Sequence, residues 1–266
     1  MNKTLVTGAA GFIGFHLCKR LLEDGYKVIA IDNLNSYYDV NLKKARLTEL
    51  EKTNKNLFFH KVDIENKKEI EKIFNNYLPE KVFNLAAQAG VRHSIENPEV
   101  YIDSNVVGFL NVLECARPLD ACRIINLNSS GAYGDAAFGD NILFEANTDP
   151  DPKTIYAVTK FASERIGTRM GELWNLDVVS VRLSAVFGRW ERQTNVRDTP
   201  SPLYQIASLI LNGENVKLSR EDCRDWIYAP DIARAVRAVR DANQLRHPVY
   251  NISLIFLIIK SFVYYT

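Results

Sequence analysis

The chain has 266 residues, of which 47% are hydrophobic and 24% are charged, a composition that allows a full globular core. Its 33 basic and 32 acidic residues leave a net charge of +1, which gives no reason to expect nucleic acid or an anionic membrane as a partner. Four cysteines without a C-x-x-C pair and four histidines are too sparse for a zinc site or a disulfide framework, so we expect no bound metal.

The chain starts directly in an apolar segment, without the basic and then apolar leader of a secreted protein, so we expect a cytoplasmic location. Strand and helix patterns alternate from there. The segments that predict strands are 3–8, 27–32, 56–63, 81–87, 122–130 and 176–188. The segments that predict helices are 12–25, 42–52, 67–77, 98–116 and 155–174. Strands separated by helices favour an α/β fold in which a doubly wound parallel sheet is covered on both faces.

A glycine-rich turn, GAAGFIG at residues 8–14, joins the first strand to the first helix. Glycines there permit a tight turn and the close approach of a pyrophosphate to backbone N–H groups at the positive end of the helix. Asp32 ends the second strand, where a carboxylate would accept hydrogen bonds from an adenosine ribose and repel a 2′-phosphate. The pattern predicts a Rossmann-like site that prefers NAD over NADP. Its predicted residues are Gly8, Gly11, Phe12, Ile13, Gly14 and Asp32.

Tyr156 and Lys160 lie four residues apart in a helical pattern, so their side chains project from the same face. A free phenol has a pKa of about 10 and is a poor base at neutral pH. The charge of Lys160 and the positive nicotinamide of bound NAD would lower that pKa. The pair therefore predicts an acid/base tyrosine with an electrostatic partner. A serine should hold the substrate hydroxyl in line with the phenol, and we favour Ser130, with Ser129 as the alternative.

The segments TGAAGFIG, NLAAQAG, SSGAYG, YAVTK and CRDWIY occur in an order that resembles the extended short-chain dehydrogenase/reductase family, the nucleotide-sugar epimerases and dehydratases. The resemblance covers residues 3–252 and implies NAD as cofactor and a UDP-sugar as substrate. It implies a homodimer formed through the helix that bears Tyr156 and its neighbour. The further cofactor contacts that it implies are Asn33, Asp63, Ile64, Ala86, Ala87, Asn105, Tyr156 and Lys160.

Within that family, residues 32–47 and 84–114 are most similar to the UDP-glucuronate 4-epimerases. This similarity implies that a hydride leaves C4 of the hexose and returns to the opposite face, which converts UDP-glucuronate to UDP-galacturonate. Arg192 would pair with the sugar carboxylate and Arg224 with the diphosphate. The substrate contacts that the similarity implies are Arg92, Ser94, Ser130, Arg192 and Arg224.

Dehydration is not expected, because Gly131 and Ala132 stand where the related 4,6-dehydratases carry an acidic pair. Two alternatives remain open. One is a sugar dehydrogenase of the same family, which would accumulate reduced cofactor. The other is a catalytically inactive NAD-binding protein with a truncated substrate region.

Past residue 184 the alternation of strands and helices weakens. We therefore predict an NAD-binding domain with the catalytic residues at 1–183, an interleaved substrate-binding region at 184–253, and an atypical apolar tail at 254–266. The apolar run at 254–259 is shorter than the roughly 20 residues of a membrane span, and a buried strand is the better interpretation. The resemblance implies a longer C-terminal region, so we expect a truncated or frame-shifted terminus.

Overall fold

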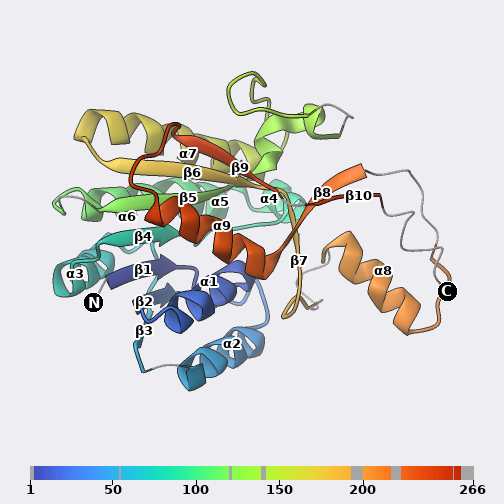
Figure 1. Cartoon of the computed structure of the whole chain (residues 1–266), viewed down its shortest axis with the longest axis horizontal. Helices are drawn as coiled ribbons and strands as arrows, with labels where there is room; N and C mark the ends of the chain where they lie inside the picture. The colour runs from blue at the N-terminus through green and yellow to red at the C-terminus, as the bar shows by residue number, and fades with distance from the viewer. Residues whose placement is uncertain are drawn as a thin grey trace.

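The computed structural model describes residues 3–53, 55–119, 122–138, 142–192, 200–216, 223–253 and 255–258. A seven-stranded parallel sheet has the order β3-β2-β1-β4-β5-β6-β9 (Figure 1). Its strands are β1 (Lys3–Thr7), β2 (Lys27–Asp32), β3 (Leu57–Lys61), β4 (Lys81–Asn84), β5 (Arg123–Ser129), β6 (Asp177–Leu183) and β9 (Val249–Ile252).

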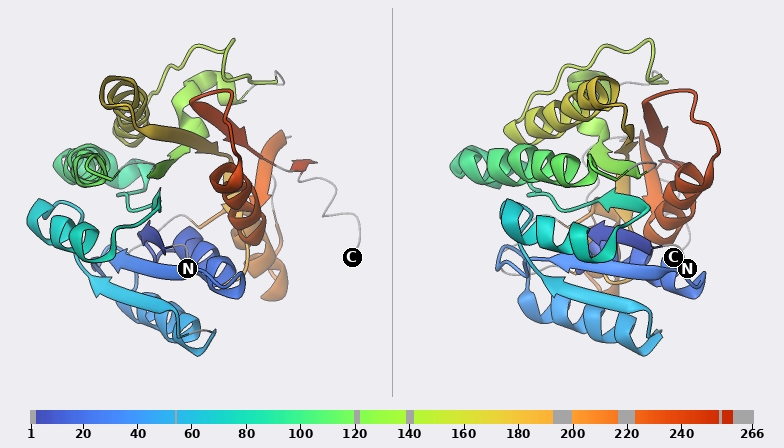
Figure 2. Two further views of the ribbon diagram at one scale, coloured as in Figure 1. Left: turned by 60° about the vertical axis from the view of Figure 1, so that its left-hand side comes forward. Right: turned by 90° about the vertical axis from the view of Figure 1, so that its left-hand side faces the viewer.

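Helices cover both faces of this sheet (Figures 1 and 2). They are α1 (Phe12–Glu23), α2 (Val40–Thr53), α3 (Lys67–Tyr77), α4 (Val91–Glu96), α5 (Pro98–Ile102), the π-helical η1 (Asp103–Gly108), α6 (Phe109–Ala116), the 3₁₀-helical η2 (Ser130–Phe138), α7 (Ile155–Trp174), α8 (Pro202–Leu211) and α9 (Ala229–Asp241). The predicted α/β fold with a doubly wound parallel sheet is confirmed.

Each face of the sheet has its own apolar core. On one face, Phe15 of α1 and Val236 of α9 pack with the strand residue Val28. On the other face, Phe74 of α3 and Phe109 of α6 belong to a second cluster. Because successive residues of a strand point to opposite faces, the continuous apolar runs of the inner strands supply both cores.

Three predicted elements differ in detail. The segment 176–188 forms two strands, β6 and β7 (Ala185–Phe187), because the chain changes sheets at Ser184. The second sheet places β8 (Cys223–Tyr228) between β7 and β10 (Ile255–Ile258), so part of the apolar tail is a strand. The single helix expected at 98–116 is interrupted by η1, a widened turn of the kind found at functional positions.

The strand β9 comes from the predicted substrate region but pairs with β6 of the main sheet, so the two regions share one sheet. The boundary at residue 183 stays a prediction. In the part of the chain that the structure covers, no helix is both long and apolar enough to cross a membrane.

Candidate active site

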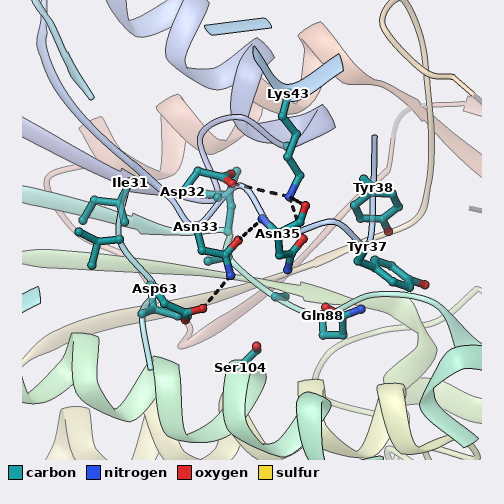
Figure 3. A pocket seen from close by; sticks show the side chains of 17 residues that line it. Ile31, Asp32, Asn33, Asn35, Tyr37, Tyr38, Lys43, Asp63, Gln88 and Ser104 are labelled. Atoms are coloured by element: carbon teal, nitrogen blue, oxygen red, sulfur yellow. Dashed lines mark hydrogen bonds and ion pairs between the residues drawn. The ribbon is translucent and has the colours of Figure 1, made fainter. Parts of the chain in front are cut away.

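A groove opens at the carboxyl ends of the parallel strands, where β1 lies between β2 and β4 (Figure 3). The strand order reverses at this point, which is where open α/β sheets bind ligands. The groove and the open solvent at its mouth together contain about 630 Å³ of empty space. It is lined by Gly8, Gly11, Ile31, Asp32, Asn33, Asn35, Tyr37, Tyr38, Lys43, Val62, Asp63, Ile64, Leu85, Ala86, Ala87, Gln88 and Ser104.

The glycine turn forms the floor of the groove. Gly8 has a φ of +68°, and a Cβ there would lie 2.8 Å from the backbone nitrogen of Ala86. A Cβ on Gly14 would overlap the carbonyl oxygen of Gly8. Gly11 caps α1 without a side-chain hydrogen bond, so the N–H groups of Phe12 and Ile13 in the first helical turn face the groove end of α1. A side chain at Gly8 or Gly14 would therefore collide with the protein backbone, so the tight turn and the close packing of α1 on it require glycine at both positions.

Asp32 holds its carboxylate at the edge of the groove, with three partners. One oxygen accepts from the backbone nitrogen of Ala10 at 3.1 Å, and the other accepts from that of Leu34 at 2.9 Å. The ammonium of Lys43 lies 3.7 Å from the same carboxylate. Burial lowers the pKa of Lys43, and the charge of Asp32 raises it. The arrangement presents a fixed carboxylate and a nearby cation to a ribose.

Sequence reasoning did not assign a role to Lys43, Asn35, Tyr37 or Tyr38, although all four line the groove. The signal was present, since all four belong to the stretch 32–47 that carries the resemblance to UDP-glucuronate 4-epimerases. Only the loop conformation shows which of these side chains face the groove.

The adenosine end of the groove is built from β2, β3 and their loops. The Asn33 side chain donates to Asp63 at 2.8 Å, which ties the two loops together. Ile64 is buried and packs so tightly on Gly108 of η1 that a Cβ there would lie 2.6 Å from Ile64 Cδ1. Asn33, Asp63 and Ile64 line the groove, as do Ala86 and Ala87, and their contact with a cofactor stays a prediction.

The side-chain amide of Asn105 forms its hydrogen bonds with other residues of the protein. Its amide oxygen accepts from Gln88 N at 2.8 Å, and its amide nitrogen donates to Gln88 O at 3.1 Å and to Thr159 Oγ1 at 3.0 Å. The residue was predicted as a cofactor contact. In the structure it joins the loop after β4 to helix α7, and its contact with a cofactor stays a prediction.

Helix α7 carries the acid/base pair. Thr154 caps the helix by accepting from Ala157 N at 3.1 Å, which fixes the orientation of the first turn. The half-buried Tyr156 lies in this turn and packs edge-to-face on Tyr101, with ring centroids 6.3 Å apart. Burial raises the pKa of Tyr156 to about 12, while a hydrogen bond with the Ser129 side chain lowers it. The protein by itself therefore shifts this pKa opposite to the expected direction, because burial disfavours the phenolate.

Ser129, at the end of β5, is thus the serine that meets the Tyr156 phenol, whereas we had favoured Ser130. The Ser129 hydroxyl accepts from Gly131 N at 3.1 Å, which leaves its proton for the phenol oxygen. Ser130 begins the 3₁₀ segment η2.

Lys160 is buried one turn beyond Tyr156. Burial lowers its pKa to about 8, and the charge of Glu164 opposes that change. Glu164 in turn accepts from the guanidinium of Arg182 on β6 at 2.8 Å, in a buried ion pair. At neutral pH Lys160 still carries its proton, so a positive charge is held beside the catalytic turn.

The predicted substrate contacts differ in how exposed their side chains are. Ser94 is fully buried and donates to Val91 O at 2.6 Å, which makes it a support of α4 rather than a surface for substrate. Arg92 and Arg192 are exposed. The backbone of Arg224 lies in β8, but its side chain lies outside the described part of the chain, as do residues 193–199 beyond Arg192.

Comparison with known proteins places these features in a family. The model of the NAD dependent epimerase/dehydratase family matches residues 4–253. The chain belongs to this family. It is 40% identical to Protein CapI of Staphylococcus aureus over 88% of this chain and 68% of that protein. It is 36% identical to a UDP-glucuronate 4-epimerase of Thermodesulfobacterium geofontis (strain OPF15) over 90% of this chain and 71% of the relative.

Solved structures agree with this membership of the NAD dependent epimerase/dehydratase family. The UDP-glucuronic acid 4-epimerase of Bacillus cereus, in complex with UDP-glucuronic acid and NAD, superposes with a TM-score of 0.81. It shares 28% sequence identity, and the match covers 94% of this chain and 77% of that one.

The residues of the groove fit NAD, the cofactor of the family. Gly8 and Gly11 line the groove with backbone alone, the first turn of α1 offers N–H groups, and the Asp32 carboxylate lines the groove where it could accept from a ribose. In the described ranges, no cluster of three or more His, Cys, Asp or Glu side chains is placed to hold a metal ion.

Proposed function

We propose that the chain catalyses the NAD-dependent epimerisation of UDP-glucuronate to UDP-galacturonate at C4. The observation that carries this proposal is the hydrogen bond between Ser129 and Tyr156. Tyr156 shares helix α7 with the buried cation Lys160, and a groove that fits NAD is present at the carboxyl ends of the strands. The relatives named above support the substrate, because two of them are named for it.

The protein's residues have separate roles in this reaction. Bound NAD supplies the group that accepts a hydride from C4 and later returns it. Tyr156 takes the proton of the C4 hydroxyl and gives it back, and Ser129 donates a hydrogen bond that stabilises the phenolate. Since burial raises the pKa of Tyr156 to about 12, the phenol needs added positive charge to act as a base at neutral pH. Lys160 supplies one such charge.

Epimerisation is favoured over dehydration by the turn after Ser129. A Cβ added to Gly131 would lie 3.2 Å from Ser129 Oγ and 3.6 Å from the Cβ of Ala157, so a longer acidic side chain there would disturb the catalytic serine. Gly131 and Ala132 themselves supply no acid for an elimination.

The test is proton NMR of the purified protein with UDP-glucuronate and NAD+, beside the variant Tyr156→Phe. We expect anomeric signals of UDP-galacturonate with the wild type and a loss of at least about 100-fold in rate with the variant. Reduced cofactor that accumulates in step with substrate loss would instead identify a dehydrogenase. An unchanged spectrum while NAD stays bound would refute the proposed reaction.

We also propose that two copies associate through α7 and the neighbouring helices α5 and η1. This surface carries the exposed apolar side chains Ile102, Val107, Val158 and Leu173, which are 50%, 42%, 44% and 59% exposed. Exposed apolar side chains on adjacent helices favour an interface.

A further inference from the structure

Two loops flank the glycine turn at the carboxyl edge of the sheet. Residues 33–39 follow β2, and residues 85–90 follow β4. Because β1 lies between these strands, a contact between the two loops must span two strand spacings, about 10 Å, above the turn at 8–11. A cofactor that runs from Asp32 toward Tyr156 has to pass through this space.

Tyr37 makes the contact between the loops. Its ring packs against His93 with a centroid distance of 4.6 Å, and its hydroxyl lies so close to Gly90 that a Cβ there would overlap it. The Tyr37 side chain hydrogen-bonds to the hydroxyl of Tyr101. That hydroxyl shares its single proton between the carbonyl oxygens of Ala89 and Gly90, which lie at 2.8 and 2.6 Å.

The loop that carries Tyr37 is held in place by its own hydrogen bonds. Asp32 and Asn33 accept from the backbone nitrogens of Leu34 and Asn35, at 2.9 and 3.0 Å. Lys43 donates to the backbone and side-chain oxygens of Asn35, at 3.2 and 2.9 Å. Figure 3 shows the tyrosine pair at the end of the groove opposite Asp63. The position of Tyr37 over the groove is thus built into the fold.

We propose that Tyr37 is a cofactor-retention residue, whose hydroxyl joins the two loops and closes the groove over bound NAD. This inference rests on the proposed function in one respect: a cofactor that first oxidises the sugar and then reduces it must remain in the groove through the whole turnover.

The first test measures the rate at which NAD+ leaves the loaded protein, after rapid dilution into a trap that consumes free NAD+. Tyr37→Phe keeps the ring but removes the hydroxyl, and we expect release at least about tenfold faster. Tyr77→Phe is the matched control. Tyr77 lies on α3, its hydroxyl bonds to His60 at 3.0 Å, and neither residue lines the groove. Release that stays within twofold of wild type in Tyr37→Phe would overturn the proposal.

A second pair of variants tests the same bridge from the other loop. Gly90→Ala places a methyl group on the Tyr37 hydroxyl at a φ of +105°, and we expect faster NAD+ release here too. Gly25→Ala is its control, because Gly25 has a comparable φ of +83° but no atom within 4 Å of an added Cβ. Equal release rates in the two glycine variants would contradict the bridge.

Combining Tyr37→Phe with Tyr101→Phe gives a further check. If the two hydroxyls act as one bridge, the double variant releases NAD+ no faster than the faster single variant. If the double variant instead shows the product of the two single increases in release rate, the two hydroxyls act separately and the bridge is overturned.

These outcomes separate the inference from the proposed reaction. Faster NAD+ release in Tyr37→Phe supports retention even if UDP-glucuronate is not turned over. Unchanged release beside full epimerase activity refutes retention alone.

Discussion

At the scale of single residues, neighbouring serines have different surroundings. Ser129 ends β5 and meets the Tyr156 phenol, so Ser129→Ala should lower kcat by about 100-fold or more. Ser130 starts the next segment, and we expect Ser130→Ala to lower kcat by less than about tenfold. Initial rates by NMR with UDP-glucuronate distinguish the two, and a larger loss in the second variant would return the role to Ser130.

Lys160 gives a prediction on pH at the same scale. Burial lowers its pKa to about 8 from 10.5, so between these values the unfolded chain binds a proton that the folded chain does not. The free energy of unfolding therefore rises with pH in this window. Relative to Lys160→Met, the wild type should gain about 2 kcal/mol between pH 8 and 9.5, as measured by urea unfolding. If the free energy of unfolding changes with pH in the same way in the wild type and in Lys160→Met, the pKa of Lys160 is not lowered.

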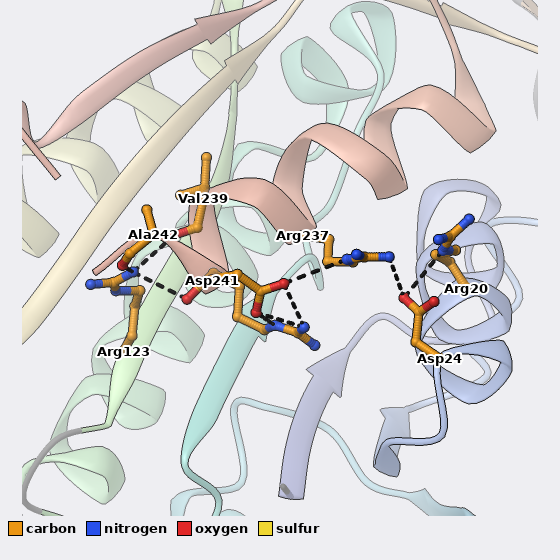
Figure 4. Close-up of polar contacts among 8 residues, drawn as sticks. Arg20, Asp24, Arg123, Arg237, Val239, Asp241 and Ala242 are labelled. Atoms are coloured by element: carbon orange, nitrogen blue, oxygen red, sulfur yellow. Dashed lines mark hydrogen bonds and ion pairs between the residues drawn. The ribbon is translucent and has the colours of Figure 1, made fainter. Parts of the chain in front are cut away.

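At the scale of elements, the end of α9 is joined to β5 by one arginine (Figure 4). Arg123 donates to the carbonyl oxygens of Val239 and Arg240, at 3.0 and 3.1 Å, and to the Asp177 carboxylate at 2.6 Å. A cation at a helix C-terminus also interacts favourably with the helix dipole. The contact therefore fixes the C-terminal end of α9 to the start of β5 in the main sheet.

Arg123→Met should lower the free energy of unfolding by about 3 kcal/mol, because buried carbonyl oxygens lose their charged donor. Arg169→Met is the control: its ion pair with Glu172 is exposed, and we expect a loss below about 1 kcal/mol. Guanidinium unfolding measures both, and equal losses would show that the Arg123 contact adds nothing beyond a surface pair.

At the scale of the whole molecule, the apolar surface of α5, η1 and α7 predicts the assembly state. Leu173→Arg places a charge in the proposed interface and should convert a dimer to a monomer in light scattering after gel filtration. Leu211→Arg is the control, because that side chain is 86% exposed on α8, away from α7 (Figure 1). A wild type that elutes as a monomer would refute the interface.

The sequence by itself determined the fold class, the glycine turn before the first helix with Asp32 at the end of the second strand, and the placement of Tyr156 and Lys160 one turn apart on one helix. Each of these depends on local spacing: alternating apolar patterns set strands and helices, and a separation of four residues places two side chains on one helical face. Such relations are local, so they can be recognised without knowledge of the tertiary contacts.

Only the tertiary structure decided between Ser129 and Ser130, since a change of conformation at the end of β5 sets which hydroxyl reaches α7. The same holds for Asn105, whose amide is consumed by Gln88 and Thr159 from distant segments. It also holds for Tyr37, which faces the groove because its loop folds across to the loop after β4. These positions depend on contacts between segments far apart in the chain, and no local pattern encodes them.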